Sequence, residues 1–137
     1  MIVVDTNVIA YFHIWGEFST QAAQAFEKDP HWVAPFVWRS EFRSILNFYL
    51  RKKILGPSDV LDIALEAEQR MYRREYEVPT NQVLTLANSS QCTTYDCEFV
   101  VLAQNFDAHL VTVEKKILRA FPNIAISLQD FVASGKS

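Results

Sequence analysis

Four acidic residues of the chain stand at positions where the surrounding sequence is apolar. Asp5 ends the apolar run "IVV", and Glu114 follows "HLVTV". Glu41 lies within "FVWRSEFRSIL" and Asp96 within "TTYDCEFVVLA". At helical spacing each of the last two shares a stripe with apolar residues, so we expect both to point at or beside the core. A carboxylate in such a place costs free energy unless its charge is compensated.

Each acid taken alone has an ordinary explanation. Glu41 and Asp96 can be carboxylates near a helix start that the helix dipole favours, and Glu114 can open a helix at Lys115. Taken together, the four indicate a common cleft, in which they would repel each other and desolvation would raise their pKa values. Divalent cations remove that conflict, and oxygen ligands without a His or Cys cluster favour Mg²⁺ or Mn²⁺. The predicted reaction is metal-assisted hydrolysis of a phosphodiester.

The elements that must position these acids alternate between short apolar runs and helical patterns. We predict strands at 2–5, 32–35, 109–113 and 124–128, and helices over about 6–15, 20–28, 36–55, 57–76, 81–89, 93–106 and 115–121. Thr6 or Asn7 is the expected cap of the first helix, and Thr93 or Thr94 that of the helix carrying Asp96. This order predicts an α/β layer fold with a mainly parallel sheet. Ligands bind such sheets beyond the carboxyl ends of the strands, which is where Asp5 stands.

Composition and length narrow the class of protein. The 137 residues suit one domain covering 1–137, and half of them are hydrophobic, which argues against global disorder. No stretch approaches the ~20 apolar residues of a membrane span, and no secretion signal is recognisable, so we expect a cytoplasmic protein without a membrane partner. The net charge of −3 gives the whole molecule no general attraction for nucleic acid.

Basic residues and cysteines are two further groups that could bind a ligand. The basic residues are clustered as Arg51, Lys52 and Lys53; Arg70, Arg73 and Arg74; and Lys115, Lys116 and Arg119. These clusters are either solvated helix ends or a surface that contacts phosphate. The two cysteines, Cys92 and Cys97, have no His nearby, so we expect reduced thiols rather than a zinc site.

Four stretches of the sequence resemble a known family when they are taken in order. They are "IVVDTNVIAY", "SEFRSIL", "TYDCEFVVLA" and "LVTVEKKIL", and together they span nearly the whole chain. The sequence resembles PIN-domain ribonucleases and, among them, the VapC-like toxins of bacterial and archaeal toxin–antitoxin pairs. This resemblance implies a three-layer αβα fold with a short, mainly parallel sheet of about four or five strands.

The same resemblance implies a metal-dependent endoribonuclease and assigns its residues. Asp5, Glu41 and Asp96 look like catalytic acids that bind Mg²⁺ or Mn²⁺, and Glu114 stands where the family usually carries Asp. Asn7 and Thr112 fall at polar positions beside the metal, where Thr112 would hydrogen-bond a carboxylate or water. The longer Glu side chain places its carboxylate ~1.5 Å further from the backbone, which bears on the affinity for a second ion. Asp107 precedes its strand and is therefore expected at the opposite end of the sheet.

Partners also follow from the resemblance, namely an RNA substrate, a second copy in a homodimer, and an antitoxin protein whose C-terminal segment fills the groove. One alternative stays open, because Glu114 departs from the family pattern: a PIN-like binding module, catalytically weak or inactive, that acts through a protein partner. Phosphatases of the haloacid-dehalogenase type need a second Asp where this chain has Asn7, which cannot act as a general acid. Receiver domains need an acidic pair on their first strand, whereas "VVDTN" holds a single acid.

Overall fold

The computed structural model describes residues 1–135 and alternates strands with helices along the chain. The strands are β1 (Ile2–Val4), β2 (Trp32–Pro35), β3 (Glu75–Tyr76), β4 (Leu110–Thr112) and β5 (Ala125–Ser127). The helices are α1 (Thr6–His13), α2 (Ser19–Lys28), α3 (Trp38–Arg51), α4 (Pro57–Arg70), α5 (Thr80–Ser90), α6 (Thr94–Phe106), α7 (Lys115–Ala120) and α8 (Leu128–Ala133). Over this part of the chain, none of the helices is both long enough and apolar enough to traverse a bilayer.

The five strands form one parallel sheet in the order β3-β2-β1-β4-β5. In the central strand β1, Val3 lies opposite Val33 of β2 and Leu110 of β4, and all three residues are fully buried. An unbroken apolar run suits a strand covered on both faces. The predicted α/β class with a parallel sheet is confirmed. Because every strand runs the same way, the carboxyl ends of β1 and β4 lie at one edge.

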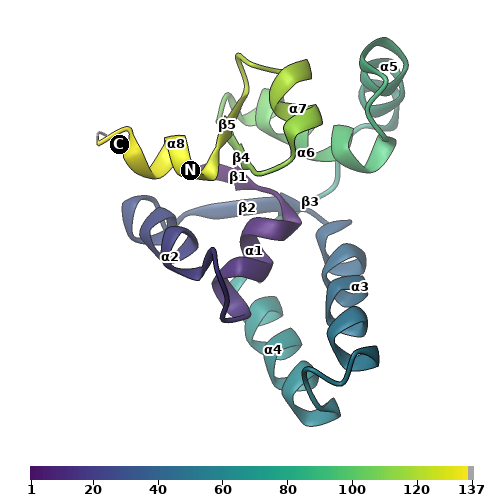
Figure 1. Cartoon of the computed structure of the whole chain (residues 1–137). Helices are drawn as coiled ribbons and strands as arrows, with labels where there is room; N and C mark the ends of the chain where they lie inside the picture. Colours follow the sequence, from purple (N-terminus) through teal and green to yellow (C-terminus); the bar gives the residue numbers. More distant parts are fainter. Residues whose placement is uncertain (136–137) are drawn as a thin grey trace.

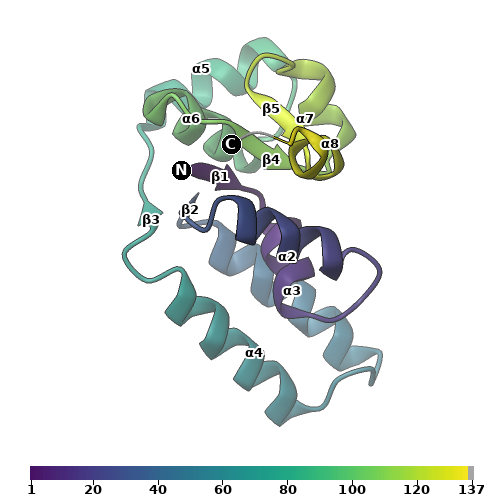
Figure 2. The ribbon, with the colours of Figure 1, turned by 90° about the vertical axis from the view of Figure 1, so that its left-hand side faces the viewer.

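Helices cover both faces of the sheet and complete the three layers (Figures 1 and 2). On one face α6 contacts β1, β2 and β4, and α5 packs on α6. On the other face α1 packs against α2, α3 and α4, and α8 lies beside α2. The α3–α4 hairpin extends away from the sheet, as Figure 2 shows.

Two elements differ from the prediction. The segment 71–76, predicted as the end of a helix, leaves α4 through a left-handed residue, Arg73 (φ 64°), and then forms the edge strand β3. The carbonyl of Arg74 accepts from the amide of Ala34 at 3.1 Å, which pairs this segment with β2. Helix α8 was not predicted; its cap is Ser127, whose Oγ accepts from the amide of Asp130 at 3.0 Å.

A buried carboxylate on β3 fixes the start of α3. Glu75 Oε2 accepts hydrogen bonds from Trp38 Nε1 at 2.7 Å and from Arg39 Nε at 2.5 Å, and its Oε1 accepts from Arg39 Nη2 at 2.9 Å. The Glu75 side chain is only 5% exposed. A bidentate, charge-assisted contact of this kind holds both partners in one geometry. It therefore ties the edge strand to the first turn of the helix that carries Glu41.

Replacing Glu75 with Ala should destabilise the fold by about 2–3 kcal/mol, because the Trp38 and Arg39 donors lose their charged partner. Urea unfolding of the purified protein measures this change. The matched control is Glu77→Ala, which removes an exposed acid two residues away and should stay within about 0.5 kcal/mol of the parent. Equal stability of the two variants would contradict the role assigned to Glu75.

Candidate active site

A pocket of about 250 Å³ lies beyond the carboxyl ends of β1 and β4. It is lined by Asp5, Thr6, Asn7, Glu41, Ser44, Ile45, Asp96, Phe99, Glu114 and Ile117. The four acids singled out in the sequence thus line one pocket, two from the ends of strands and two from helices α3 and α6. We call it the acidic pocket.

Asp5 is the most constrained of these acids. It is the N-cap of α1, so that its Oδ1 accepts from the amide of Val8 at 3.1 Å, which corrects the expected cap at Thr6 or Asn7. Its Oδ2 accepts from the Thr112 hydroxyl and from the amide of Val113 at 3.3 Å. The carboxylate of Asp5 therefore joins the central strand, the first helix and β4. Only 5% of the residue is exposed.

Burial raises the pKa of Asp5 from its ordinary 3.8 to about 6. The hydrogen bonds from Thr112, Val8 and Val113 act in the opposite direction, and repulsion by Glu114 adds to the rise. Desolvation outweighs the three donors, so the charged form of Asp5 is less favourable here than it would be in water. A bound cation would supply the missing compensation.

Glu41 faces the same pocket from α3 and shares its electrostatic character. Burial raises the pKa of Glu41, and the charges of Asp96 and Glu114 raise it further. Its Oε1 accepts from the Thr6 hydroxyl at 2.6 Å. The sequence predicts Thr6 only as a possible helix cap, although its place directly after Asp5 is a signal for a role beside the acids.

Polar side chains connect Glu114 to Asp5. Asn7 Nδ2 donates to Glu114 Oε1 at 3.1 Å, and the amide of Glu114 donates to Thr112 Oγ1 at 3.0 Å. Thr112 therefore accepts from one acidic residue while its hydroxyl donates to the other, Asp5. The hydrogen bond to a carboxylate that the sequence suggested for Thr112 is present.

Asp96 stands in the first turn of α6, and its amide donates to Oγ1 of the cap residue Thr93 at 3.0 Å. Glu98, two residues on, was not singled out in the sequence. Burial and the charge of Glu41 raise the pKa of Glu98, which places a fifth acid within electrostatic reach of the pocket. Asp107 ends α6 and lines a separate cavity with His109, before β4 begins, and so lies at the opposite end of the sheet as expected.

The donors of the acidic pocket fit a hard divalent cation in kind. They are carboxylates with hydroxyl and amide neighbours, the oxygen-rich set that Mg²⁺ and Mn²⁺ prefer. As the side chains stand, no three His, Cys, Asp or Glu residues among 1–135 are grouped closely enough to hold an ion.

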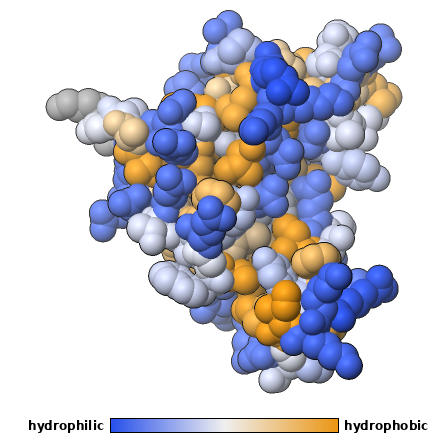
Figure 3. All heavy atoms as spheres, in the orientation of Figure 1, coloured by the Kyte–Doolittle hydropathy of each residue, from blue (hydrophilic) through white to orange (hydrophobic). Residues whose placement is uncertain are grey.

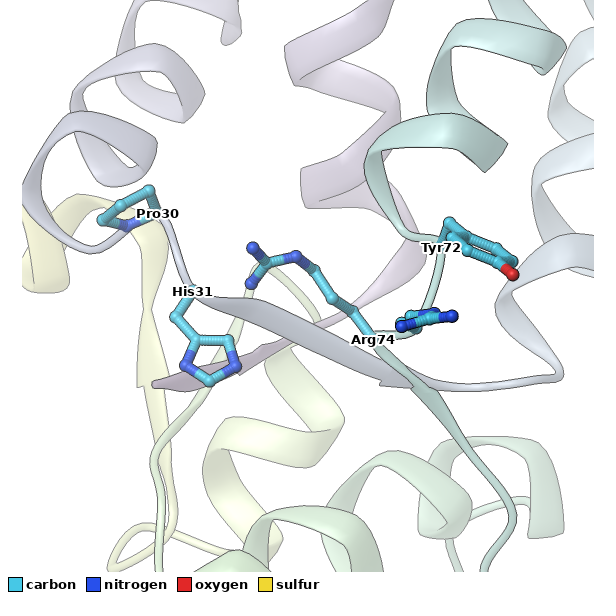
Figure 4. A pocket seen from close by; sticks show the side chains of 5 residues that line it. Pro30, His31, Tyr72 and Arg74 are labelled. Carbon is cyan, nitrogen blue, oxygen red and sulfur yellow. The ribbon is translucent and has the colours of Figure 1, made fainter.

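The basic residues of the chain mostly lie away from this pocket. A larger cavity, of about 510 Å³, is lined by Pro30, His31, Tyr72, Arg73 and Arg74 at the amino end of β2 (Figure 4). The guanidinium of Arg70 lies over the ring of Phe12, 4.9 Å from its centroid, so it serves packing. Of the three clusters, only that of Lys115 and Lys116 directly follows an acid of the pocket.

The raised pKa of Asp5 predicts a pH dependence of stability for the metal-free protein. Between pH 4 and 6 the unfolded chain loses the Asp5 proton first, so the contribution of Asp5 to stability falls by about 3 kcal/mol as the pH rises and is level above pH 6. Asp5→Asn should remove this part of the loss. Urea unfolding in a chelator across this pH range gives the profiles.

The control for this prediction is Asp62→Asn, because Asp62 is an exposed acid on α4. Its profile should follow that of the parent protein. A profile for Asp5→Asn that also runs parallel to the parent would exclude Asp5 as the source of the pH dependence.

The PIN domain family matches residues 2–122, a range that includes the four predicted acids. A search of curated protein sequences finds no match. Among solved structures, the chain is similar to the crystal structure of PAE2754 from Pyrobaculum aerophilum, with a TM-score of 0.77 and 15% sequence identity. The likeness covers 97% of this chain and 94% of that chain, and at this identity it supports the fold alone. Since the family match extends over most of the sequence, the chain belongs to the PIN domain family, whose fold is generally a nuclease fold.

Proposed function

We propose that this protein is an endoribonuclease that uses Mg²⁺ or Mn²⁺ to hydrolyse phosphodiester bonds in RNA. The observation that carries the proposal is the convergence of Asp5, Glu41, Asp96 and Glu114 on one pocket, where burial raises the pKa of the first two. Nucleases of the PIN family generally use divalent metals. A cluster of partly desolvated carboxylates is costly in a fold unless it has such a use.

In this proposal the four acids hold the ion, and the polar neighbours orient them. When bound, the ion supplies Lewis-acid activation of water and neutralises charge on the phosphate. Asp5 Oδ1 accepts from the amide of Val8 and keeps a second lone pair for a cation. Thr112 and Val113 direct hydrogen bonds to Oδ2 and favour the ionised form of Asp5. Thr6 and Asn7 fix the carboxylates of Glu41 and Glu114 in the same way.

The finer proposal is a cytoplasmic toxin of a toxin–antitoxin pair, with an antitoxin protein and a second copy of the chain as partners. It rests on the resemblance, and an exposed apolar surface supports it. Phe48, Ile54, Leu61 and Leu65 of the α3–α4 hairpin are each more than half exposed. Figure 3 shows apolar side chains gathered near the end of this hairpin beside hydrophilic ones. Contiguous apolar patches of this kind are typical of protein interfaces.

Asp5→Asn and Asp96→Asn should each lower the rate of RNA cleavage by about 100-fold or more, because each removes a carboxylate ligand. The assay follows cleavage of a mixed RNA substrate with Mg²⁺ or Mn²⁺ and with a chelator. Calorimetric titration of Mn²⁺ should show binding to the parent protein and its loss in Asp5→Asn. Asp62→Asn should match the parent in both measurements.

Cleavage that persists in the chelator, or in a clean preparation of Asp5→Asn, would overturn the mechanism. If the parent protein neither cleaves RNA nor binds metal, the result favours the alternative, a catalytically weak or inactive PIN-like module that acts through a protein partner. Metal binding without cleavage would indicate that the RNA offered was not the substrate.

Glu114→Asp should cleave RNA at least as fast as the parent, because it restores the residue that the family usually has at this position. The Asn7 side chain donates to Glu114 Oε1, so the shorter acid would also test how much of the pocket depends on that contact. Steady-state rates at saturating metal provide the comparison. A large loss of activity would mean that the pocket is built around the longer side chain.

A further inference from the structure

A second cavity adjoins the acidic pocket and differs from it in chemistry. It has a volume of about 280 Å³ and shares Asn7 and Ile45 with the acidic pocket as lining residues. Four aromatic residues contribute to its walls, namely Tyr11, Trp15, Phe18 and Tyr49. They come from α1, from the α1–α2 loop and from α3. We call this cavity the aromatic groove.

Trp15 is the feature of the groove that the fold does not explain. It is 86% exposed, more than any other large apolar side chain that the structure describes, whereas Trp32 and Trp38 are buried. Leaving an indole in water forgoes the free energy that its burial would provide. The position of Trp15 therefore indicates a use outside the core.

The loop that carries Trp15 is held by hydrogen bonds. The buried hydroxyl of Ser19 accepts from the amide of Gly16 at 2.8 Å and donates to the carbonyl of Ile14 at 3.1 Å. The residues on both sides of Trp15 are thus tied to the start of α2. An aromatic side chain on a fixed turn loses little conformational freedom when a ligand binds.

Tyr11 links the groove to the acidic pocket. Its ring packs on Phe18 with 4.9 Å between centroids. The pKa of Tyr11 is raised by burial and then by the charges of Asp5 and Glu114, so its hydroxyl lies within electrostatic reach of both acids. Because the groove and the acidic pocket share Asn7 and Ile45 in their walls, a molecule in the groove would lie beside the acidic pocket.

We propose that the aromatic groove binds an unpaired base of single-stranded RNA, stacked on Trp15, next to the phosphate that enters the acidic pocket. This inference rests on the proposed ribonuclease function. Among the described residues, the lining of the groove includes one charged side chain, that of Glu17, which suits a neutral base better than a phosphate. Aromatic side chains stack any base, and RNA-binding proteins use them to hold unpaired nucleotides. Bases in a duplex are already stacked on each other, so the groove selects single strands.

The size and the position of the groove favour a base over a protein segment. Its volume of about 280 Å³ lies just below the ~300 Å³ at which drug-sized ligand sites begin, and this suits one flat ring system with its sugar. It also shares Asn7 and Ile45 with the pocket proposed for the phosphate, so neighbouring parts of one nucleotide chain can occupy the two cavities. A protein segment remains the competing occupant that the experiment must separate.

The fluorescence of Trp15 gives a direct test, because the other two tryptophans are 1% and 0% exposed. The probes are a seven-nucleotide single-stranded RNA, the same RNA annealed to its complement, and versions with one base removed at successive positions. Ca²⁺ replaces Mg²⁺ as an oxygen-liganded ion, and a gel verifies that the RNA stays intact. We expect saturable quenching by the single strand, none by the duplex, and loss of quenching when one particular base is missing.

The protein variants provide an independent readout. Trp15→Leu should weaken binding of labelled RNA and raise KM for cleavage by about 5-fold to 100-fold with little change in kcat. Trp15→Phe should retain most of the affinity, since it keeps a ring that can stack. Tyr72→Leu removes an aromatic side chain of similar exposure at the other end of the sheet and should behave like the parent.

The outcomes separate this inference from the proposed function. Suppose that Trp15→Leu cleaves RNA in a metal-dependent way with unchanged KM, and that RNA does not quench the fluorescence of the parent protein. This result would contradict base binding in the groove and would still support the proposed nuclease function. Base-dependent quenching without any RNA cleavage would support base binding in the groove and contradict the proposed nuclease function. Protection of Trp15 from iodide by a protein partner but not by RNA would overturn the inference in favour of a protein interface. The base-removal series uses the parent protein, so the test does not depend on the folding of any variant.

Discussion

A buried carboxylate at the end of the central strand is the constraint on which the site depends. Asp5 follows β1, and its carboxylate needs hydrogen-bond donors at the place where β1, α1 and β4 meet. Its donors are the amides of Val8 and Val113 and the hydroxyl of Thr112, so one side chain joins α1 to a strand more than a hundred residues away. The same Thr112 hydroxyl accepts from the amide of Glu114. Satisfying Asp5 therefore also sets the position of a second acid.

The two acids on helices depend on how the first turns of those helices are fixed. The start of α3 is held by Glu75 through Trp38 and Arg39, three and two residues before Glu41. The start of α6 is held by the Thr93 cap, which accepts from the amide of Asp96 itself. Polar contacts thus position all four acids without using the oxygens of every carboxylate, and those oxygens remain available to the pocket. Rigid support of this kind is what a catalytic constellation requires.

The parts of this architecture that could be read from the sequence are those with a strong local signal. The apolar run before Asp5 predicts a buried parallel strand, and the helical stripe around Asp96 with the cap at Thr93 predicts α6. Residues whose role depends on partners far away in the sequence carry no local pattern that predicts that role. Glu75 reads as part of a helix, and β3 is a strand because its backbone pairs with β2, where the amides of Ala34 and Phe36 donate to the carbonyls before and after Glu75. Trp15 looks like one more apolar residue at the end of α1 until its exposure is known.

In the proposals made above, the acidic pocket takes a phosphate and the aromatic groove takes a base. These separate roles would explain how an acidic protein can hold RNA. The net charge is −3, and only Lys115 and Lys116 of the basic clusters adjoin an acid of the pocket. In most nucleic-acid complexes the release of counterions by many Lys and Arg contacts supplies the affinity. In the proposed function few such contacts are available, so a cation in the acidic pocket and base stacking on Trp15 would have to supply much of the affinity. In the proposed function such a protein would bind short unpaired segments that fill both cavities and would discriminate against duplexes that offer phosphates alone.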